Sequence, residues 1–297
     1  MTIVSALSMG AVAQSGEGFN IKDMILHHLA DSRELDWPGG PYHLWSFDPV
    51  HIGPLTLDFS ITKHVAFMLI AATLAGLTLV LAGRSAARAR AAGSETGPKG
   101  AANVVEAFVL YLRDEVAMPA IGHGGERFVP YIIGVFFFIL FSNLLGLVPW
   151  GASPTGNISV TAALALLSFL IIEFAGMRAL GPSGYAKTIF YAPPGLGPVG
   201  TLLVGAIMTP VEFLSKLTKP FALAVRLFAN MTAGHAVVLA LTGLLVLAQA
   251  SNVIWAAPAP LVMAVAIMLL EIFVAFIQAY IFAMLTAVFI GLIRHPH

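Results

Sequence analysis

The sequence predicts an all-α integral membrane protein with about five membrane helices plus an interfacial amphipathic helix. Hydrophobic residues make up 58% of the 297 residues, charged residues only 10%, and the mean hydropathy is +0.89. So little polar surface could not cover a water-soluble globule of this length. Several apolar stretches are also long enough to cross the roughly 30 Å hydrocarbon core of a bilayer as helices.

The chain divides into a polar N-terminal segment, residues 1–62, and a membrane domain, residues 63–297. From residue 14 onwards acidic residues dominate the N-terminal segment, so we expect it to lie outside the bilayer, on the extracytoplasmic side. Residues 1–13 end in an Ala-Val-Ala tripeptide but lack a positively charged start, so they are either a cleaved signal peptide or an unprocessed terminus. Four aromatic residues are expected at the lipid headgroups or in a small extramembrane cap: Trp37, Tyr42, Trp45 and Phe47.

Five apolar stretches are the predicted spans: residues 64–82, 128–148, 158–180, 198–247 and 259–293. At 1.5 Å per residue the last two would be about 75 Å and about 50 Å long, more than an upright helix needs. We therefore expect two long, strongly tilted helices, with Pro210 and Pro220 as candidate kinks in the first of them. Residues 101–118 carry apolar side chains at helical spacing with charges between them, which is typical of an interfacial helix that does not span.

The basic residues predict the orientation of these spans. Cations follow the first span in an Ala/Gly-rich loop, flank the end of the third, and recur near the C-terminus. By the positive-inside rule these parts lie in the cytoplasm, which leaves the N-terminus extracytoplasmic. The residues concerned are Arg84, Arg88, Arg90, Lys99, Arg178, Lys187 and Arg294.

Several chemistries are disfavoured by the sequence. The formal net charge is zero and no basic stretch interleaves with aromatics, so we expect no nucleic-acid partner. The chain has no cysteine, no zinc-protease motif, no phosphate-binding loop and no dinucleotide fingerprint. We therefore expect no cofactor, no metal and no ATP site on this chain; the histidines of the N-terminal region, at 27, 28, 43, 51 and 64, are only a weak metal candidate.

Arg226 is the only formally charged residue between Lys219 and Glu271, in an otherwise apolar stretch. A guanidinium keeps its proton at physiological pH, and its insertion near a bilayer centre costs roughly 2.5–3.5 kcal/mol on insertion scales. An ionisable residue in a membrane span is a candidate functional site by default. The alternative is a side chain that reaches the interface or forms an ion pair between helices.

A sparse set of polar residues accompanies Arg226 on the last two predicted helices. Asn230 lies four positions after Arg226 and shares its face, and Gln278 shares a face with Glu271. His235 is either a proton carrier or an interior histidine bonded to a carbonyl, and Glu271 either titrates or has a structural partner. Asn230 and Gln278 could instead join helices, and three residues that share a face could be interfacial charges: Glu212, Lys216 and Lys219. Glu173 has no partner that the sequence identifies.

These residues lie in motifs that resemble subunit a of rotary F-type ATP synthases. The most specific is Arg226-Leu227-Phe228-Ala229-Asn230-Met231, within residues 215–235. Residues 142–149 and 154–161 resemble the exit of the family's second span and the entry of its third. Residues 271–290, with Gln278-Ala279-Tyr280-Ile281-Phe282 at their centre, resemble its final helix. The resemblance extends from about residue 60 to the end.

The resemblance implies a noncatalytic, proton-conducting stator subunit of the membrane sector, Fo or CF(0), of ATP synthase in a bacterial inner membrane. The implied partners are the c-subunit ring, the b subunits of the peripheral stalk, the whole F1Fo complex and membrane lipid. Arg226 would face the carboxylates of the ring and separate two half-channels. Asn230, His235, Glu271 and Gln278 match positions along the outer half-channel, and Glu212 matches one toward the inner half-channel.

One pair departs from part of the family. Some members carry an acidic residue where this chain has His235 and a histidine where it has Glu271, and either order supplies one imidazole and one carboxyl to the same route. The alternatives to a stator are a secondary transporter or channel that binds an anion at Arg226, and a membrane scaffold. A transporter would be expected to have inverted repeats and paired broken helices, and neither is detected here.

Overall fold

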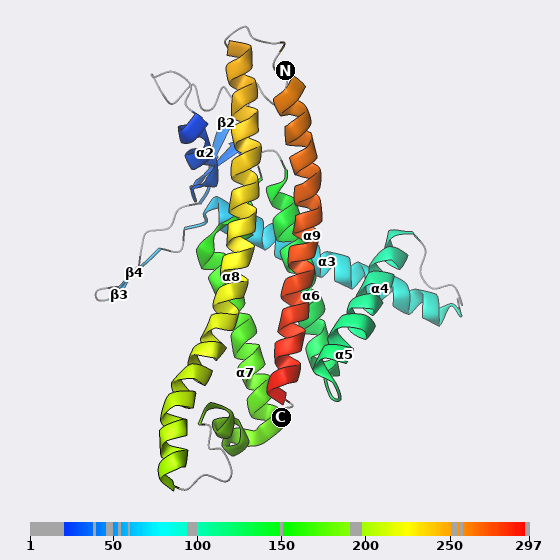
Figure 1. The fold of residues 1–297 in the computed structure, drawn as a ribbon. Coiled ribbons are helices and arrows are strands. Elements are labelled where there is room, and N and C mark those ends of the chain that lie inside the picture. Colours follow the sequence, from blue (N-terminus) through cyan, green and yellow to red (C-terminus); the bar gives the residue numbers. More distant parts are fainter. Residues whose placement is uncertain are drawn as a thin grey trace. The chain divides into compact units, whose positions relative to one another are not determined.

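The computed structural model describes residues 21–37, 40–45, 50–52, 55–58, 60–93, 100–148, 151–190, 198–250, 255 and 258–294. Helices dominate this part of the chain (Figure 1). The α-helices are α2 (Ile21–Leu29), α3 (Lys63–Ala91), α4 (Ala101–Tyr111), α5 (Met118–Ile121), α6 (Val129–Gly146), α7 (Ile158–Ile189), α8 (Pro198–Ala250) and α9 (Pro258–Arg294). The predicted helical fold class is confirmed.

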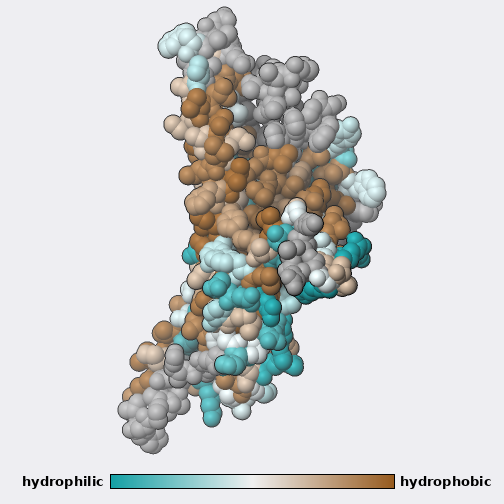
Figure 2. All heavy atoms as spheres, turned by 90° about the vertical axis from the view of Figure 1, so that its right-hand side faces the viewer, coloured by the Kyte–Doolittle hydropathy of each residue, from teal (hydrophilic) through white to brown (hydrophobic). Residues whose placement is uncertain are grey.

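Within the described residues, five helices are long and apolar enough to cross a membrane: α3, α6, α7, α8 and α9. Many of their large apolar side chains are exposed on the outer surface of the chain. Figure 2 shows these side chains in brown over much of the visible face. An exposed apolar surface of this extent suits lipid rather than water. The chain is therefore a multi-pass membrane protein, with spans where the hydropathy predicted them.

The ends of the spans follow local chemistry. The first helix runs on to Ala91, whereas the sequence predicted a loop from about residue 83; this boundary was wrong because Ala and Arg are good helix formers. Arg88 and Arg90 lie in its last turn, where cations suit the helix dipole. The third helix turns at Gly181, whose φ of 71° favours glycine, directly after the predicted end at residue 180. A short helical piece follows the turn up to Ile189.

The helix α8 is unbroken over 53 residues, which corresponds to about 80 Å at 1.5 Å per residue. Pro210 and Pro220 both lie inside it, and Figure 1 shows one continuous ribbon through them. α9 continues for 37 residues. Both helices exceed the length of an upright span, as predicted. Their tilt in a bilayer stays a prediction.

The stretch predicted as an interfacial helix is helical throughout but changes helix type along its length. α4 ends at Tyr111, a π-helical turn spans Leu112–Ala117, and α5 ends at Ile121. It is not among the helices long and apolar enough to span in the described part of the chain. Arg90 Nη2 donates to Glu106 Oε1 at 3.3 Å, which fastens the end of α3 to α4.

The N-terminal segment contains two short antiparallel hairpins that the sequence did not predict. β1 (Glu34–Trp37) pairs with β2 (Gly40–His43), and β3 (Val50–Ile52) pairs with β4 (Leu55–Leu57). Arg33 donates to Asp58, linking the two ends of this region. The hydroxyl and amide of Ser60, together with Arg33, hold the pKa of Asp58 below its usual range. The proposed signal peptide and Phe47 lie outside the described residues.

Two compact units make up the chain, and several helices contribute one part to each. The first unit comprises Met1–Leu74, Phe138–Asn157 and Leu227–Gln278. The second unit comprises Ala75–Phe137, Ile158–Arg226 and Ala279–His297. Each has its own cavity, described separately below. The division proposed from the sequence, at residue 62, stays a prediction.

Candidate functional site

A cavity of about 370 Å³ lies within the first unit. Its walls come from the ends of α3 and α6, the loop after α6, and parts of α8 and α9. Most of the lining is apolar, with a few polar side chains that include His64, Thr232, His235 and Glu271. At about 30 Å³ per water molecule, this volume could hold roughly a dozen. A largely apolar chamber with a few titratable groups suits transfer of a small ion.

His235 is held by one nitrogen and offers the other to the cavity. Its Nε2 lies 2.7 Å from the carbonyl oxygen of Gly146, so Nε2 carries the proton and donates. This contact matches the interior histidine bonded to a carbonyl that the sequence allowed. Nδ1 is then free to accept, and no hydrogen-bond partner for it is found among the described residues. The bond to Gly146 thus fixes which nitrogen can receive a proton.

Glu271 faces the free nitrogen of His235. Its Oε1 lies 3.9 Å from His235 Nδ1, just beyond a hydrogen bond, and is likewise buried without a partner in the described part of the chain. Two unsatisfied polar atoms facing each other need a proton or a water between them. Gly234 permits this approach, because a Cβ at that position would overlap Glu271 Oε1. The arrangement can take up and release a proton with a small side-chain movement.

A buried hydrogen-bond chain fixes the loop that forms one wall of this cavity. Ser153 Oγ donates to the Ser142 carbonyl at 3.2 Å and lies 2.8 Å from Thr155 Oγ1. Thr155 donates to Asn143 Oδ1 at 2.6 Å, and Asn143 Nδ2 donates to the Ala275 carbonyl at 3.3 Å. Buried polar groups joined in this way hold one geometry. Ser142, Asn143 and Thr155 belong to the sequence motifs at 142–149 and 154–161, Ser153 lies just before the second motif, and Ala275 belongs to α9.

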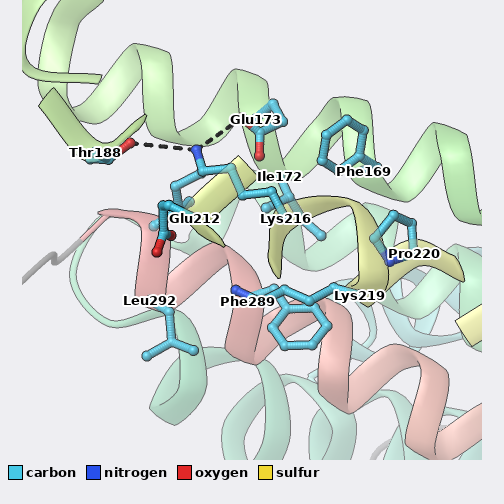
Figure 3. Close-up of a pocket in the computed structure, with 11 residues that line it drawn as sticks. Phe169, Ile172, Glu173, Thr188, Glu212, Lys216, Lys219, Pro220, Phe289 and Leu292 are labelled. Carbon is cyan, nitrogen blue, oxygen red and sulfur yellow. Dashed lines mark hydrogen bonds and ion pairs between the residues drawn. The ribbon is translucent and has the colours of Figure 1, made fainter. Parts of the chain in front are cut away.

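A second cavity, of about 190 Å³, lies within the second unit. Figure 3 shows its lining, with Glu212, Lys216 and Lys219 of α8 and Glu173 of α7 around it. The face shared by the three α8 residues, expected from their spacing, is thus turned toward one cavity. Phe289 of α9 covers one side, and its ring lies 5.2 Å from the Lys219 ammonium.

Lys216 and Glu173 form a buried ion pair at the second cavity. Lys216 Nζ is 3.5 Å from Glu173 Oε2, and each residue is 9% exposed. The ammonium also donates to the hydroxyl of Tyr185 at 3.4 Å. It donates to the hydroxyl of Thr188 at 3.4 Å as well, as Figure 3 shows. Both hydroxyls belong to the short helical piece after Gly181. The sequence predicted no partner for Glu173, and the turn at Gly181 brings these hydroxyl groups to the ammonium.

We expect Lys216→Met to destabilise the second unit. It would leave the Glu173 carboxylate buried without its cation, which typically costs roughly 3–5 kcal/mol. The double variant Lys216→Met with Glu173→Leu should recover much of that loss, since no charge then stays unpaired. The temperature at which the subunit leaves the purified complex measures the effect. Lys219→Met is the matched control, and equal losses in both single variants would contradict the role of the pair.

Arg226 and Asn230 line neither of these cavities. Both side chains are exposed on α8, together with the small residues Ala222, Ala229 and Ala233. Among the described residues, Arg226 has no hydrogen-bond or ion-pair partner, so the structure does not support the ion pair between helices that was considered for it. A permanent cation on an apolar helix therefore faces outward from the chain.

The structure brings some predicted site residues together and leaves others apart. His235 and Glu271 meet in the first cavity, and Glu212 lines the second. Gln278 is buried on α9, 5% exposed, and is not in the lining of either cavity. His64 was missed as a residue of the first cavity, because nothing in the sequence links the start of α3 to α8 and α9.

The fold and the first cavity define a class: a multi-pass helical membrane protein with an imidazole and a carboxyl facing each other inside it. Residues 65–291 match the model of the family described as ATP synthase A chain. The chain belongs to this family.

Similar proteins agree with that assignment. The chain is 41% identical to ATP synthase subunit a 2 of Chlorobaculum tepidum, over 98% of this chain and 79% of that protein. It is 44% identical to ATP synthase subunit a of Chloroherpeton thalassium, over 90% of this chain and 75% of the relative. It is 49% identical to that of Myxococcus xanthus, over 80% and 73% respectively.

Proposed function

We propose that this chain is the proton-conducting stator subunit of the membrane sector of an F1Fo ATP synthase. It would offer two half-channels to the carboxylates of a c-subunit ring, with Arg226 between them, and so couple proton flow to ring rotation and ATP synthesis. The observation that carries the proposal is the exposed Arg226, which has no partner among the described residues and lies on an apolar helix. Such a cation needs an anion from outside the chain.

The surface around Arg226 supports a protein partner rather than lipid alone. Ala222, Ala229 and Ala233 share the exposed face, and small side chains let a second helix approach closely. Asn230, also exposed, adds a polar group one turn from the cation. A neighbouring helix with a carboxyl at mid-membrane would meet both the charge and the shape of this face.

The two cavities support the two half-channels. The outer one would use the pair His235 and Glu271, with Asn230 and Gln278 further along it. The inner one would use Glu212 in the cavity that also contains Lys216 and Lys219. Arg226 cannot relay a proton at physiological pH, because its guanidinium does not release one. It would therefore attract the ring carboxylates and block a direct leak between the half-channels.

We further propose the cellular context. The chain would lie in a bacterial inner membrane with its N-terminus outside and its C-terminus in the cytoplasm, as the cations of α3, α7 and α9 favour. It would bind the b subunits of the peripheral stalk in addition to the c ring. ATP itself would bind elsewhere in the complex.

Cross-linking tests the proposal, because this chain contains no cysteine. With Asn230→Cys and a cysteine beside the c-subunit carboxyl, we expect oxidation to join the two subunits. The control is Leu77→Cys, which replaces an apolar residue of α3 that is 52% exposed. This cysteine should not react with the c subunit. A complex with a c ring but no link from position 230 would contradict the facing surface. A purified particle without a c ring would contradict the stator role.

A further inference from the structure

A second imidazole and carboxylate pair joins the N-terminal segment to the start of α3. His64 Nδ1 lies 2.8 Å from Asp31 Oδ1. His64 is buried at 4% exposure, whereas a third of the Asp31 side chain, 33%, is exposed. Asp31 Oδ2 also accepts from Asn157 Nδ2 at 3.3 Å. One member of the pair therefore meets solvent outside the predicted spans, and the other is enclosed.

His64 lines the same cavity as His235 and Glu271. Its Nδ1 is bonded to the Asp31 carboxylate, so a proton exchanged with the cavity would pass through its other ring nitrogen, Nε2. This is the arrangement by which an imidazole passes a proton between two sites. The chain thus carries titratable groups from an exposed carboxylate to the enclosed pair His235 and Glu271, all within the first unit.

Other charged groups of the described part of the segment do not connect its surface with the cavity as Asp31 and His64 do. Arg33 and Asp58 are paired with each other, and Glu34 lies 3.4 Å from His43. Lys63 is buried and has interactions of its own, with its amide bonded to the Ser32 carbonyl at 3.0 Å. Of these charged groups, none lines the cavity. Among the charged groups that the structure describes in this segment, Asp31 and His64 are thus the titratable pair that connects the exposed surface with the cavity.

We propose that Asp31 and His64 are the outermost proton-relay residues of this chain, at the entrance of the first cavity. The inference rests on the proposed function. For inward flow, a proton from water reaches the Asp31 carboxylate and passes to the unprotonated ring nitrogen of His64, while the other ring nitrogen releases its proton to water in the cavity. That proton then reaches His235 and Glu271. Rotation of the imidazole side chain turns the unprotonated nitrogen back toward Asp31, so one proton has moved inward in each cycle.

The test compares passive proton conduction in membrane vesicles stripped of the catalytic sector. His64→Gln keeps a hydrogen-bonding side chain but cannot carry a proton, and Asp31→Asn keeps the bond acceptor without the titratable carboxyl. We expect each to lower conduction by on the order of 100-fold, the lower end of what a positioned proton-transfer group contributes. The matched control is His43→Gln, which removes a second histidine and carboxylate pair found among the described residues of the segment, His43 with Glu34. His43 is 77% exposed, lines no part of the cavity, and should be dispensable.

Chemical rescue distinguishes a proton relay at His64 from a purely structural role, in which His64 only holds the N-terminal segment in place. In the His64→Ala variant, added imidazole should restore conduction, whereas a variant that had only loosened the segment would not respond. If His64→Gln does not assemble, Asp31→Asn decides the matter, because its side chain is partly exposed and its loss should be tolerated.

The outcomes distinguish this inference from the proposed function. Normal conduction in Asp31→Asn or His64→Gln, with conduction lost in Glu271→Gln, overturns the relay and leaves the stator role intact. Normal conduction in all three variants, together with normal ATP synthesis in Arg226→Ala, overturns both. Reduced conduction in His64→Ala that imidazole does not restore also overturns the relay.

Discussion

Replacing Arg226 with alanine is expected to abolish proton-driven ATP synthesis while the complex still assembles. The side chain has no partner among the described residues, so its removal breaks no contact that holds the chain together. Without the cation, the carboxylates of the c-subunit ring would no longer be attracted to this position. Protons could then pass between the half-channels without turning the c ring. One charge moving through 100 mV releases about 2.3 kcal/mol, and that energy would be lost at each such passage.

The measurement for Arg226 is ATP synthesis in inverted vesicles, with subunit content checked in the purified complex. Arg84→Ala is the matched control, since it removes another exposed arginine, in α3. Arg226→Lys should also fail to support normal synthesis, because a lysine can lose its proton in an apolar setting and lacks the forked donors of arginine. Near-normal ATP synthesis in Arg226→Ala would contradict the proposed role of Arg226 between the two half-channels.

Hydropathy alone was enough to predict where the membrane helices lie. The apolar runs are long, and a helix that crosses lipid must satisfy its own backbone, so length and composition determine the element. The predicted limits of α8 and α9 agree with the structure to within a few residues. The end of α3 was predicted less well, because its last turns contain Ala and Arg, which are compatible with both a helix and a polar loop.

The pairings inside the units could not be predicted from local patterns. Glu173 and Lys216 are 43 positions apart, and only the turn at Gly181 and the packing of α7 on α8 bring the surrounding hydroxyl groups to the ammonium. The same holds for His64, which reaches the first cavity through the fold. The hairpins of the N-terminal segment were missed because their strands have only three or four residues each, too few for a clear alternating pattern.

The sequence did predict the chemistry of the first cavity, though not its geometry. It offered His235 and Glu271 as one imidazole and one carboxyl along a common route. It also left open an interior histidine bonded to a carbonyl. The structure joins the two readings, because the bond to the Gly146 carbonyl is what turns Nδ1 toward Glu271. A structural contact and a candidate proton path thus use different nitrogens of one ring.

Replacing Glu271 with glutamine is expected to slow passive proton conduction by on the order of 100-fold or more, as loss of a positioned proton-transfer group does. The amide has the size of the carboxyl and removes no hydrogen bond between Glu271 and His235, whose facing atoms are 3.9 Å apart, so assembly should be kept. It cannot take up and release a proton at the same position. Vesicles stripped of the catalytic sector, with an imposed potential, give the rate directly. Conduction that stays unchanged across pH would assign Glu271 a structural role.

A neighbouring glycine gives an independent test of the same geometry. Gly234→Ala leaves the carboxyl chemistry untouched but introduces a Cβ that overlaps Glu271 Oε1, so the carboxylate must move away from its present position. We expect conduction to fall here too, because the facing geometry with His235 Nδ1 is disturbed. Gly76→Ala, in α3, is the matched control, since a Cβ there meets nothing within 4 Å. If both glycine variants conduct equally well, the close approach of Glu271 to α8 is not needed for proton passage.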